Sequence, residues 1–425
     1  MQAVSFLGLF VMIALAWAMS ENRRYFPWKL VIWGLVLQLG FGLVVLSPEA
    51  QAFIFKYVDS AIRTLIGFSE KGADFTFQSV EPHRIVDGDG NSQFIAGHIS
   101  PPVKTFAFWI LPSIIFFSSL MAVSYHVGIM QRLVRGMAWV MQRTMGTSGA
   151  ETLSTAANIF LGQTEAPLLV KPFIARMTRS ELFCVMLGGF ANTAGGVLAA
   201  YVGFLKDVPG IAGHLVTSSI LSAPAALVIA KVMVPEREVP ETAGTLHINH
   251  ERIDGNVMSA AARGASEGMQ LAINVAAMLI AFVALVACID WGLGLFWVAG
   301  QPLSLARTLG WVFTPLAFVM GIPWEEAPKV GRLLGEKLVL TEFIAYVHLG
   351  ELQKSADALS ARSAVIASYA LCGFANFASI GIQIGGIGPL APHRKDELAS
   401  LAVRAMLGGS LATFMTACVA GAFSP

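Results

Sequence analysis

Charged residues are scarce in this chain. Asp, Glu, Lys and Arg make up 13% of its 425 residues, whereas a soluble domain carries about 25%. Apolar residues make up 55%, and the mean hydropathy is +0.66. The net charge of +1 gives no basis for nucleic-acid binding. The composition therefore indicates a membrane protein rather than a set of soluble domains.

Cysteine and histidine are also few, and their placement argues against two classes of site. The four cysteines lie in apolar runs without a CxxC pair or metal-ligand spacing, so we interpret them as small core residues. An intramembrane hydrolase would need a nucleophile beside a base, or a metal motif such as HExxH. Neither pattern appears in the apolar segments, so the sequence disfavours an enzyme.

Long uncharged segments predict an all-α polytopic membrane protein with about eight transmembrane helices. A helix needs about 20 apolar residues to cross the bilayer. Segment 51–67 is too charged to span, and its apolar positions predict an interfacial helix on the outer surface. The candidate spans are 1–19, 30–46, 105–125, 182–205, 213–230, 268–289, 308–323, 363–388 and 405–423.

Basic loops predict the orientation of these spans. Lys and Arg concentrate on the cytoplasmic side of membrane proteins, so we expect the basic loops inside and both the N-terminus and the polar stretch 70–104 outside. This arrangement makes the spans 182–205 and 363–388 run in opposite directions. The loops expected inside are 20–29, 126–150, 231–264 and 391–399.

Two apolar segments are interrupted near their middle. Gly162 to Pro167 breaks the segment 152–170, and the segment 338–350 is short and contains Glu342. Helix-breaking residues are tolerated at membrane depth only where the backbone faces protein or an aqueous cavity. We therefore predict two re-entrant hairpins, with Glu165 and Glu342 near their tips.

Each predicted hairpin precedes a span broken by Gly and Asn. The tetrapeptide Gly-Phe-Ala-Asn occurs at 189–192 and again at 373–376. Because the two broken spans are oriented oppositely, we predict an inverted repeat. Inverted repeats with paired interrupted helices place a substrate site near the bilayer midplane. A secondary transporter is the favoured interpretation over a channel, since paired carboxylates with asymmetric polar partners favour a binding site.

The residue types at the two breaks indicate a neutral polar solute. Neither broken span holds a fixed cation, which disfavours anionic substrates. An apolar solute would leave the amide and hydroxyl side chains there unpaired. A nucleoside fits, and a sugar or a neutral amino acid stays open. In the structural alternative, Lys171 or Lys337 forms an ion pair with a hairpin carboxylate.

Several motifs together carry a resemblance to a known family. The chain resembles the bacterial concentrative nucleoside transporters from Met1 to about Phe423. The motifs are Asn158-Ile-Phe-Leu-Gly-Gln-Thr-Glu-Ala-Pro167, Met177-Thr-Arg-Ser-Glu-Leu182, Ser222-Ala-Pro-Ala225, Glu342-Phe-Ile-Ala-Tyr346, and Gly373-Phe-Ala-Asn-Phe377 with Ser379-Ile-Gly-Ile-Gln-Ile-Gly-Gly386.

The resemblance implies a homotrimer in the bacterial inner membrane, with a periplasmic N-terminus and a transport domain that moves against a scaffold in an elevator mechanism. Residues 1–147 would form scaffold, including the external helix and loop 48–104, and 148–233 the first repeat of the transport domain. Residues 234–310 would form a cytoplasmic loop and a scaffold span, and 311–425 the second repeat.

The resemblance also assigns the substrate and ion residues. Nucleosides such as uridine, cytidine and adenosine would be imported by alternating access, with sodium as coupling ion and no organic cofactor; proton coupling is the alternative. Sodium ligands would be the Asn158 and Asn192 side chains and the Leu161 and Thr193 carbonyls. The substrate residues would be Gln163, Thr164 and Glu165 at the nucleobase, Val197 beside it, Phe374 along the pocket, and Glu342, Asn376 and Ser379 at the ribose.

Three positions depart from the family pattern. Thr341 stands where Asn is usual, and Asn192 stands where the family has a small hydroxyl residue. At the third position, Ala378 replaces the common Ser, so the resemblance implies one hydroxyl fewer near the ribose. The first departure changes the hydrogen bonding expected at the second hairpin. The second changes the expected ion ligand from a hydroxyl to an amide oxygen.

The orientation can be tested by single-cysteine labelling in sealed cells. We expect cysteines at positions 393–395 to react only with membrane-permeant reagents, because the loop 391–399 is predicted to be cytoplasmic. Labelling of these positions by an impermeant reagent would contradict the inverted repeat.

Overall fold

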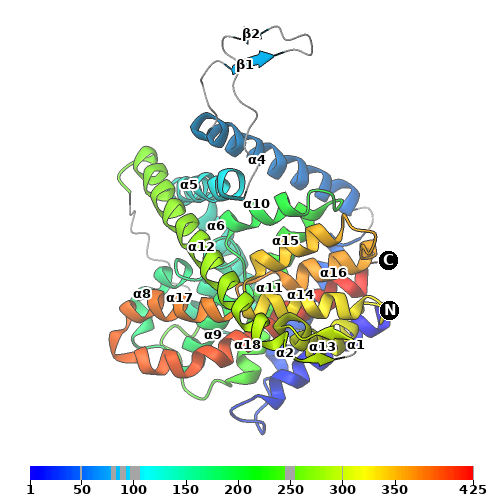
Figure 1. Cartoon of the computed structure of the whole chain (residues 1–425). Helices are drawn as coiled ribbons and strands as arrows, with labels where there is room; N and C mark the ends of the chain where they lie inside the picture. The colour runs from blue at the N-terminus through cyan, green and yellow to red at the C-terminus, as the bar shows by residue number, and fades with distance from the viewer. Residues whose placement is uncertain are drawn as a thin grey trace.

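Helices account for nearly all regular structure in the chain (Figure 1). The computed structural model describes residues 1–47, 50–77, 83–86, 92–95, 106–244, 254–298 and 300–424. The described strands form two short antiparallel pairs, β1 (His83–Val86) with β2 (Ser92–Ile95) and β3 (Trp297–Val298) with β4 (Gln301–Pro302). The predicted all-α class is confirmed. Most of the predicted external stretch 70–104 lies outside the described residues.

The helices follow the predicted spans in order. Five helical segments are long and apolar enough to cross a membrane by length and composition, among the described residues: 28–45, 107–127, 179–204, 211–233 and 392–423. The helices before the first hairpin are α1 (Gln2–Ala18), α2 (Trp28–Val45), η1 (Gln51–Phe55), α4 (Lys56–Phe77), η2 (Phe106–Ile110), α5 (Leu111–Val127) and α6 (Ile129–Met145).

The remaining helices form the two repeats and the long helix between them. They are α7 (Gly149–Ala157), η3 (Ala166–Val170), α8 (Lys171–Ile174), α9 (Arg179–Ala191), α10 (Gly195–Phe204), α11 (Ile211–Met233), α12 (Val257–Leu293), α13 (Leu305–Val319), α14 (Ala327–Val339), α15 (Glu342–Leu352), α16 (Ala361–Leu371), α17 (Phe377–Ile387), η4 (Gly388–Leu390), η5 (Pro392–Arg394) and α18 (Lys395–Phe423).

One predicted span is wrong as an independent crossing. The segment 308–323 forms α13, which has 15 residues and is therefore about 22 Å long, shorter than the roughly 30 Å hydrocarbon core. It packs along α14 instead. Gly321, at a φ of 98°, turns the chain between the two helices. The second hairpin is correspondingly longer than predicted, since it comprises α14 and α15.

The two hairpins turn at the predicted places. In the first hairpin, α7 ends at Ala157 and the chain returns through η3 and α8. A capping box between Ser148 and Glu151 starts α7. In the second hairpin, only Leu340 and Thr341 separate α14 from α15. Both carboxylates, Glu165 and Glu342, lie at or directly after these turns.

Both predicted broken spans are interrupted in the structure. The first separates into α9 and α10 at residues 192–194, and the second into α16 and α17 at residues 372–376. The tetrapeptide Gly-Phe-Ala-Asn occupies different places in the two breaks. It closes α9 in the first repeat, whereas it lies within the break in the second. The two repeats therefore share the order of their elements, but the tetrapeptides do not occupy equivalent positions.

The two breaks lie against each other in the core. The Gly373 amide donates a hydrogen bond of 2.8 Å to Thr193 Oγ1. Gly373 adopts a φ of 117°, and a Cβ at this position would lie 2.8 Å from the Ala191 carbonyl oxygen. Only glycine meets both requirements without strain. This contact joins the first half of one broken helix to the break of the other.

Helices α5 and α12 pack closely through small residues. A Cβ at Gly264 would lie 2.6 Å from the Ala122 Cβ, and one at Gly268 would lie 2.8 Å from the Ile115 Cα. Such small residues, spaced four apart, let membrane helices approach closely. In Figure 1, α12 runs beside α5 along one side of the molecule. The pair forms a wall that faces the first repeat.

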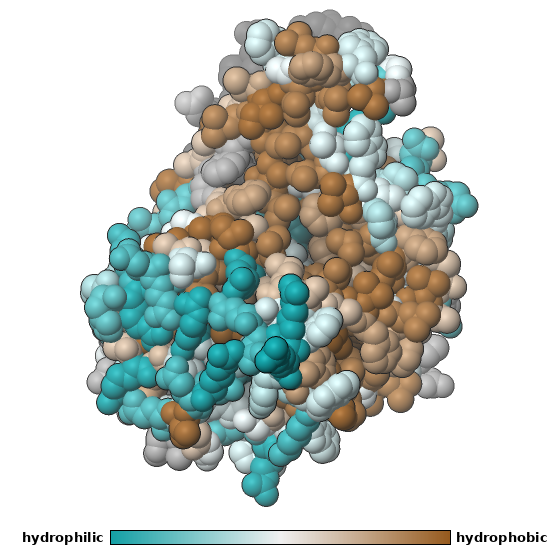
Figure 2. All heavy atoms as spheres, turned by 90° about the horizontal axis from the view of Figure 1, so that it is seen from below, coloured by the Kyte–Doolittle hydropathy of each residue, from teal (hydrophilic) through white to brown (hydrophobic). Residues whose placement is uncertain are grey.

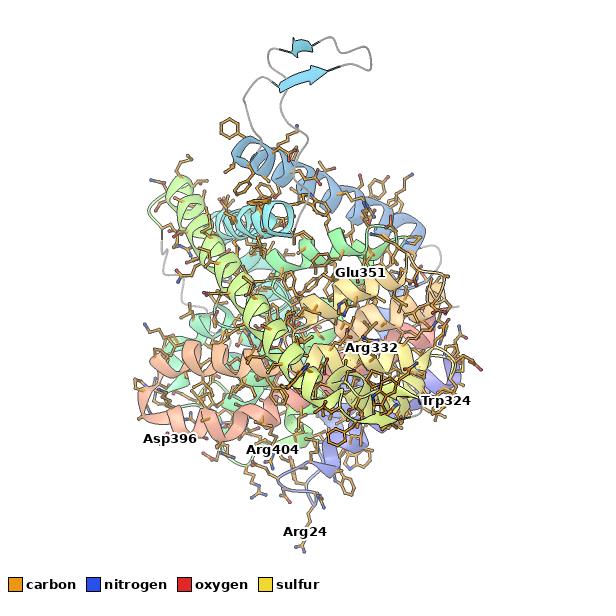
Figure 3. All side chains as sticks on the ribbon, in the orientation of Figure 1. Arg24, Trp324, Arg332, Glu351, Asp396 and Arg404 are labelled. Carbon is orange, nitrogen blue, oxygen red and sulfur yellow. The ribbon has the colours of Figure 1, made fainter. Side chains whose placement is uncertain are left out.

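Charged side chains gather at one end of the molecule. Figure 2 shows hydrophilic residues on one part of the lower face and hydrophobic residues over much of the rest. Arg24, Asp396 and Arg404 project from this lower side in Figure 3. Glu21 accepts hydrogen bonds from Arg179 at 2.9 Å and Arg404 at 2.6 Å. The bond from Arg179 holds the Glu21 pKa below its ordinary value. Segment 20–29 and the start of α18, both predicted to be cytoplasmic, therefore lie together.

We expect Gly373→Ala to disrupt the crossing of the two breaks. The added methyl group would meet backbone oxygens, and such overpacking costs about 1–3 kcal/mol. The thermal midpoint and substrate affinity should both fall. Gly381→Ala, in the same region, is the matched control because no atom lies within 4 Å of its added Cβ. Equal behaviour of the two variants would refute this interpretation.

Candidate functional site

A cavity of about 290 Å³ lies where the hairpin tips meet the two breaks. Its volume is at the lower end of small-molecule pockets, about 300–1,000 Å³. All eight predicted substrate residues line this one cavity: Gln163, Thr164, Glu165, Val197, Glu342, Phe374, Asn376 and Ser379. They come from four segments that are far apart in the sequence: 163–165, 197, 342 and 374–379. The structure thus brings the complete predicted set together.

The second hairpin and second break form a closed hydrogen-bond network. Asn376 Nδ2 donates to Glu342 Oε2 at 2.7 Å, and Asn376 Oδ1 accepts from the Ser379 amide at 2.8 Å. Asn376 is thereby the N-cap of α17. Glu342 starts α15, where the helix dipole favours a negative charge. The carboxylate and the amide hold each other in place at the cavity wall.

Tyr201, a residue that the sequence did not single out, completes this network. Its hydroxyl donates to Glu342 Oε1 at 2.9 Å, and its ring stacks on Tyr346 at a centroid distance of 4.2 Å. Tyr201 lies on α10, the second half of the first broken helix. A single hydroxyl within an apolar run was the available signal, but its partner lies 141 residues away.

Several polar groups along the cavity have no hydrogen-bond partner among the described residues. Gln163 is 6% exposed, and its Oε1 has no hydrogen-bond partner among the described residues. Thr341 Oγ1 and the Tyr125 hydroxyl also line the cavity without a partner in that part of the chain. Buried polar atoms without partners are costly. These atoms therefore indicate a ligand with its own donors and acceptors.

The wall formed by α5 and α12 adds a charged pair to the cavity. Arg263 and Glu267 both line it, joined by a 2.8 Å contact. Asp254 binds the other side of the guanidinium, also at 2.8 Å. The two carboxylates that bind Arg263 offset its charge. Glu165 and Glu342 therefore give the cavity a net negative charge. This agrees with the prediction that anionic solutes are disfavoured.

The structural alternative for the hairpin carboxylates fails. Lys171 is exposed, and the Lys337 ammonium donates to the Ala370 carbonyl at 2.9 Å and to Thr413 Oγ1 at 3.2 Å. Among the described residues, no ion pair joins either lysine to Glu165 or Glu342. Neither carboxylate is therefore held in a salt bridge by these lysines.

Comparison with known proteins agrees with this geometry. Family models described as the N-terminus and the C-terminus of Na⁺-dependent nucleoside transporters match residues 7–80 and 214–421. A nucleoside-recognition model matches residues 107–208. The uncharacterized transporter YutK of Bacillus subtilis is 42% identical, covering 98% of each chain.

The chain belongs to the concentrative nucleoside transporter family. The predicted resemblance is confirmed, and the relatives are transporters rather than enzymes. Rat solute carrier family 28 member 3 is 39% identical over 100% of this chain and 59% of its own length. The chain therefore spans about three fifths of such animal relatives and nearly all of the bacterial one.

Solved structures of the family member CNTnw share the fold. An inward-facing, substrate-bound state is 41% identical with a TM-score of 0.87, covering 99% of this chain and 97% of that one. An intermediate state of a CNTnw variant gives a TM-score of 0.88 at 39% identity, with full coverage of both chains. The predicted helical membrane fold is confirmed by this likeness.

In the present chain, the residues predicted to bind sodium lie close to the first break. Both polar atoms of the Asn158 side chain are buried and unpaired among the described residues. A Cβ at Gly188 would lie 3.5 Å from Asn158 Nδ2, and Asn192 Nδ2 donates to the Gly188 carbonyl at 2.9 Å. An unpaired amide oxygen suits a hard cation. The donor set fits an ion.

Ser222 contacts the predicted ion ligand Asn192. The single proton of the Ser222 hydroxyl has two acceptors in reach, Asn192 Oδ1 and the Ser219 carbonyl. An amide oxygen has two lone pairs, so Asn192 Oδ1 keeps one lone pair for an ion even when it accepts this proton. The other two predicted ligands are backbone carbonyls, those of Thr193 and Leu161. The Thr193 hydroxyl accepts a hydrogen bond from the Gly373 amide, which leaves its carbonyl as the predicted ligand, and Leu161 lines the cavity.

We expect Glu342→Gln to weaken nucleoside binding roughly tenfold or more. The change keeps the shape but removes the charge, and hydrogen bonds to charged groups contribute about 1.5–3 kcal/mol each. Tyr201→Phe removes one donor and should have a smaller effect of the same sign. Calorimetric titration with uridine measures both. Equal affinity of the wild type for uracil and uridine would argue against a ribose role for Glu342.

Proposed function

We propose that this protein imports nucleosides across the bacterial inner membrane, driven by a sodium gradient. The observation that carries the proposal is that all eight predicted residues line one cavity, in which Gln163 Oε1 and Thr341 Oγ1 have no partner among the described residues. A nucleoside offers hydroxyls to acidic groups and an amide-like edge to Gln163. The descriptions of two matched family models, Na⁺-dependent nucleoside transporter and nucleoside recognition, support the same substrate class.

The geometry suggests how each end of a nucleoside would be held. The tip of the first hairpin, with Gln163, Thr164 and Glu165, would bind the nucleobase. The fixed pair of Glu342 and Asn376 would accept and donate hydrogen bonds at the ribose hydroxyls. Val197 and Phe374 supply the apolar surface on which the base would pack. Uridine, cytidine and adenosine are the nucleosides that we expect to bind in this arrangement.

Alternating access would follow from movement of the two repeats past the wall of α5 and α12. That wall contributes Arg263 and Glu267 to one side of the cavity. The repeats, joined by the contact between Gly373 and Thr193, would move as one transport domain in an elevator mechanism. Residues 1–147 and 234–310 would be the scaffold, assembled as a homotrimer with the N-terminus in the periplasm.

Sodium would couple to nucleoside binding through the first hairpin. An ion at Asn158, Asn192 and the Leu161 and Thr193 carbonyls would join the hairpin tip to the first break. It would thereby hold Gln163, Thr164 and Glu165 in their binding positions. Coupling of this kind is reciprocal and typically amounts to about 1–3 kcal/mol.

We expect uridine affinity to rise roughly 5- to 150-fold between zero and saturating sodium, as this coupling implies. Asn158→Ala should flatten that dependence and leave weak uridine binding. Asn274→Ala is the control, because this asparagine lies on α12 and does not line the cavity. Calorimetric titration at fixed pH measures the affinities.

The same titration separates the alternatives. Uridine binding that follows pH in the absence of sodium, and ignores sodium at every pH, would replace the sodium site with proton coupling. Saturable uptake of another neutral polar solute, with no uridine competition, would overturn the substrate class. Uptake of uridine by sealed vesicles with an imposed sodium gradient tests the direction of transport.

A further inference from the structure

The first arms of the two hairpins end in comparable positions. Asn158 caps the end of α7 and lies beside Gly188, one turn before α9 ends. Lys337 lies in the last turn of α14, and its ammonium reaches the Ala370 carbonyl, one residue before α16 ends. Each hairpin therefore directs one polar side chain at the C-terminal end of the first half of a broken helix.

The two side chains differ in how they are satisfied. Both polar atoms of Asn158 are unpaired among the described residues, which leaves a place for a cation. In the second repeat, the Lys337 ammonium itself lies at the corresponding position. Its side chain is 1% exposed, and its ammonium donates to the Ala370 carbonyl at 2.9 Å and to Thr413 Oγ1 at 3.2 Å. The Phe414 ring lies 5.9 Å from it.

The partners of Lys337 resemble the ligands of a metal ion. A buried ammonium normally has a carboxylate partner, yet the described residues place none within salt-bridge distance of Lys337. A carbonyl and a hydroxyl take that role. The Ala370 carbonyl belongs to the last turn of α16, where carbonyls lack helical partners and the helix dipole is negative. This end of α16 is therefore a cation site filled by a side chain.

Both arms of the second hairpin are fastened to the end of α16. The Tyr346 hydroxyl, from α15, donates to the Ser368 carbonyl at 2.6 Å, while Lys337 of α14 binds Ala370. Thr413 of α18 donates its own proton to the Ser410 carbonyl at 2.9 Å, so its oxygen is available to accept from Lys337. The hairpin that carries Glu342 is thus tied to α16 and α18 without a mobile ion.

We propose that Lys337 is a tethered cation, which occupies in the second repeat the place that the first repeat leaves for its coupling ion. It is a positioning residue: it holds the second hairpin, and with it Glu342, in the binding arrangement at all times. Only the first hairpin then depends on a mobile cation. The comparison with Asn158 rests on the proposed ion site, whereas the role of Lys337 stands on its own contacts.

Chemical rescue tests the proposal. Lys337→Ala removes three carbons and the ammonium, which n-propylammonium can replace. We expect uridine affinity to fall at least tenfold in this variant and to recover in a saturable manner with propylammonium, but not with 1-propanol, which has the same length and no charge. Lys329 lies on the same helix but is only partly buried, and its ammonium donates to the Asp357 carbonyl; Lys329→Ala should show neither loss nor rescue.

Two further variants keep the proposal falsifiable if Lys337→Ala is unstable. A variant that unfolds without amine but gains thermal stability with propylammonium, and not with propanol, supports it. Thr413→Val removes one acceptor while Lys337 stays, and should weaken uridine binding several-fold, with Thr413→Ser restoring it. Wild-type affinity in both Lys337→Met and Thr413→Val would overturn the proposal.

The sodium titration of the wild type separates the two ideas. If uridine binding responds to sodium in the wild type but propylammonium restores nothing in Lys337→Ala, the tethered cation is refuted and the coupling ion stands. If the amine restores binding while the wild type ignores sodium, the tethered cation stands and sodium coupling is refuted.

Discussion

The two breaks in the membrane helices contact each other in the core. Gly373 donates its amide to Thr193 Oγ1 and lies directly on the backbone of α9. Within a membrane, unwound backbone is tolerated only where protein or a cavity satisfies its polar groups. Each break here provides part of what the other requires. The two repeats therefore meet at their least regular points, and the binding cavity forms beside that meeting.

The hairpins supply the remaining polar groups at this depth. Glu342 is positioned from two sides, by Asn376 of the second repeat and by Tyr201 of the first. The cavity wall at the end proposed to bind the ribose is consequently held in place before a ligand arrives, which limits the ordering that binding requires. The end proposed to bind the nucleobase is different, because Gln163 Oε1 has no hydrogen-bond partner among the described residues. One end of the cavity is thus preorganised, and the other is completed by its ligands.

Charge is distributed unequally between the repeats. Lys337 fills its site with a lysine ammonium, whereas Asn158 offers only a neutral amide at the comparable position. Under the proposed coupling, this asymmetry assigns permanent attachment to one hairpin and ion-dependent attachment to the other. In this proposal one mobile ion serves both repeats, because the Lys337 ammonium occupies the site in the second repeat that corresponds to the ion site in the first.

Residue patterns in the chain predicted the elements and much of the cavity lining. Uncharged length predicted the helices, and Gly, Pro and Asn at membrane depth predicted the hairpins and the breaks, because the bilayer allows few alternatives. Composition misassigned 308–323 as a span, since an apolar segment that packs on α14 has the same composition as one that faces lipid. Family motifs supplied eight of the residues that line the cavity.

Which side chains meet could be read only from the folded chain. Tyr201 with Glu342, Ser222 with Asn192 and Lys337 with Ala370 are contacts between segments far apart in the chain. Their partners depend on how the two breaks cross, and no local pattern of residues encodes that crossing.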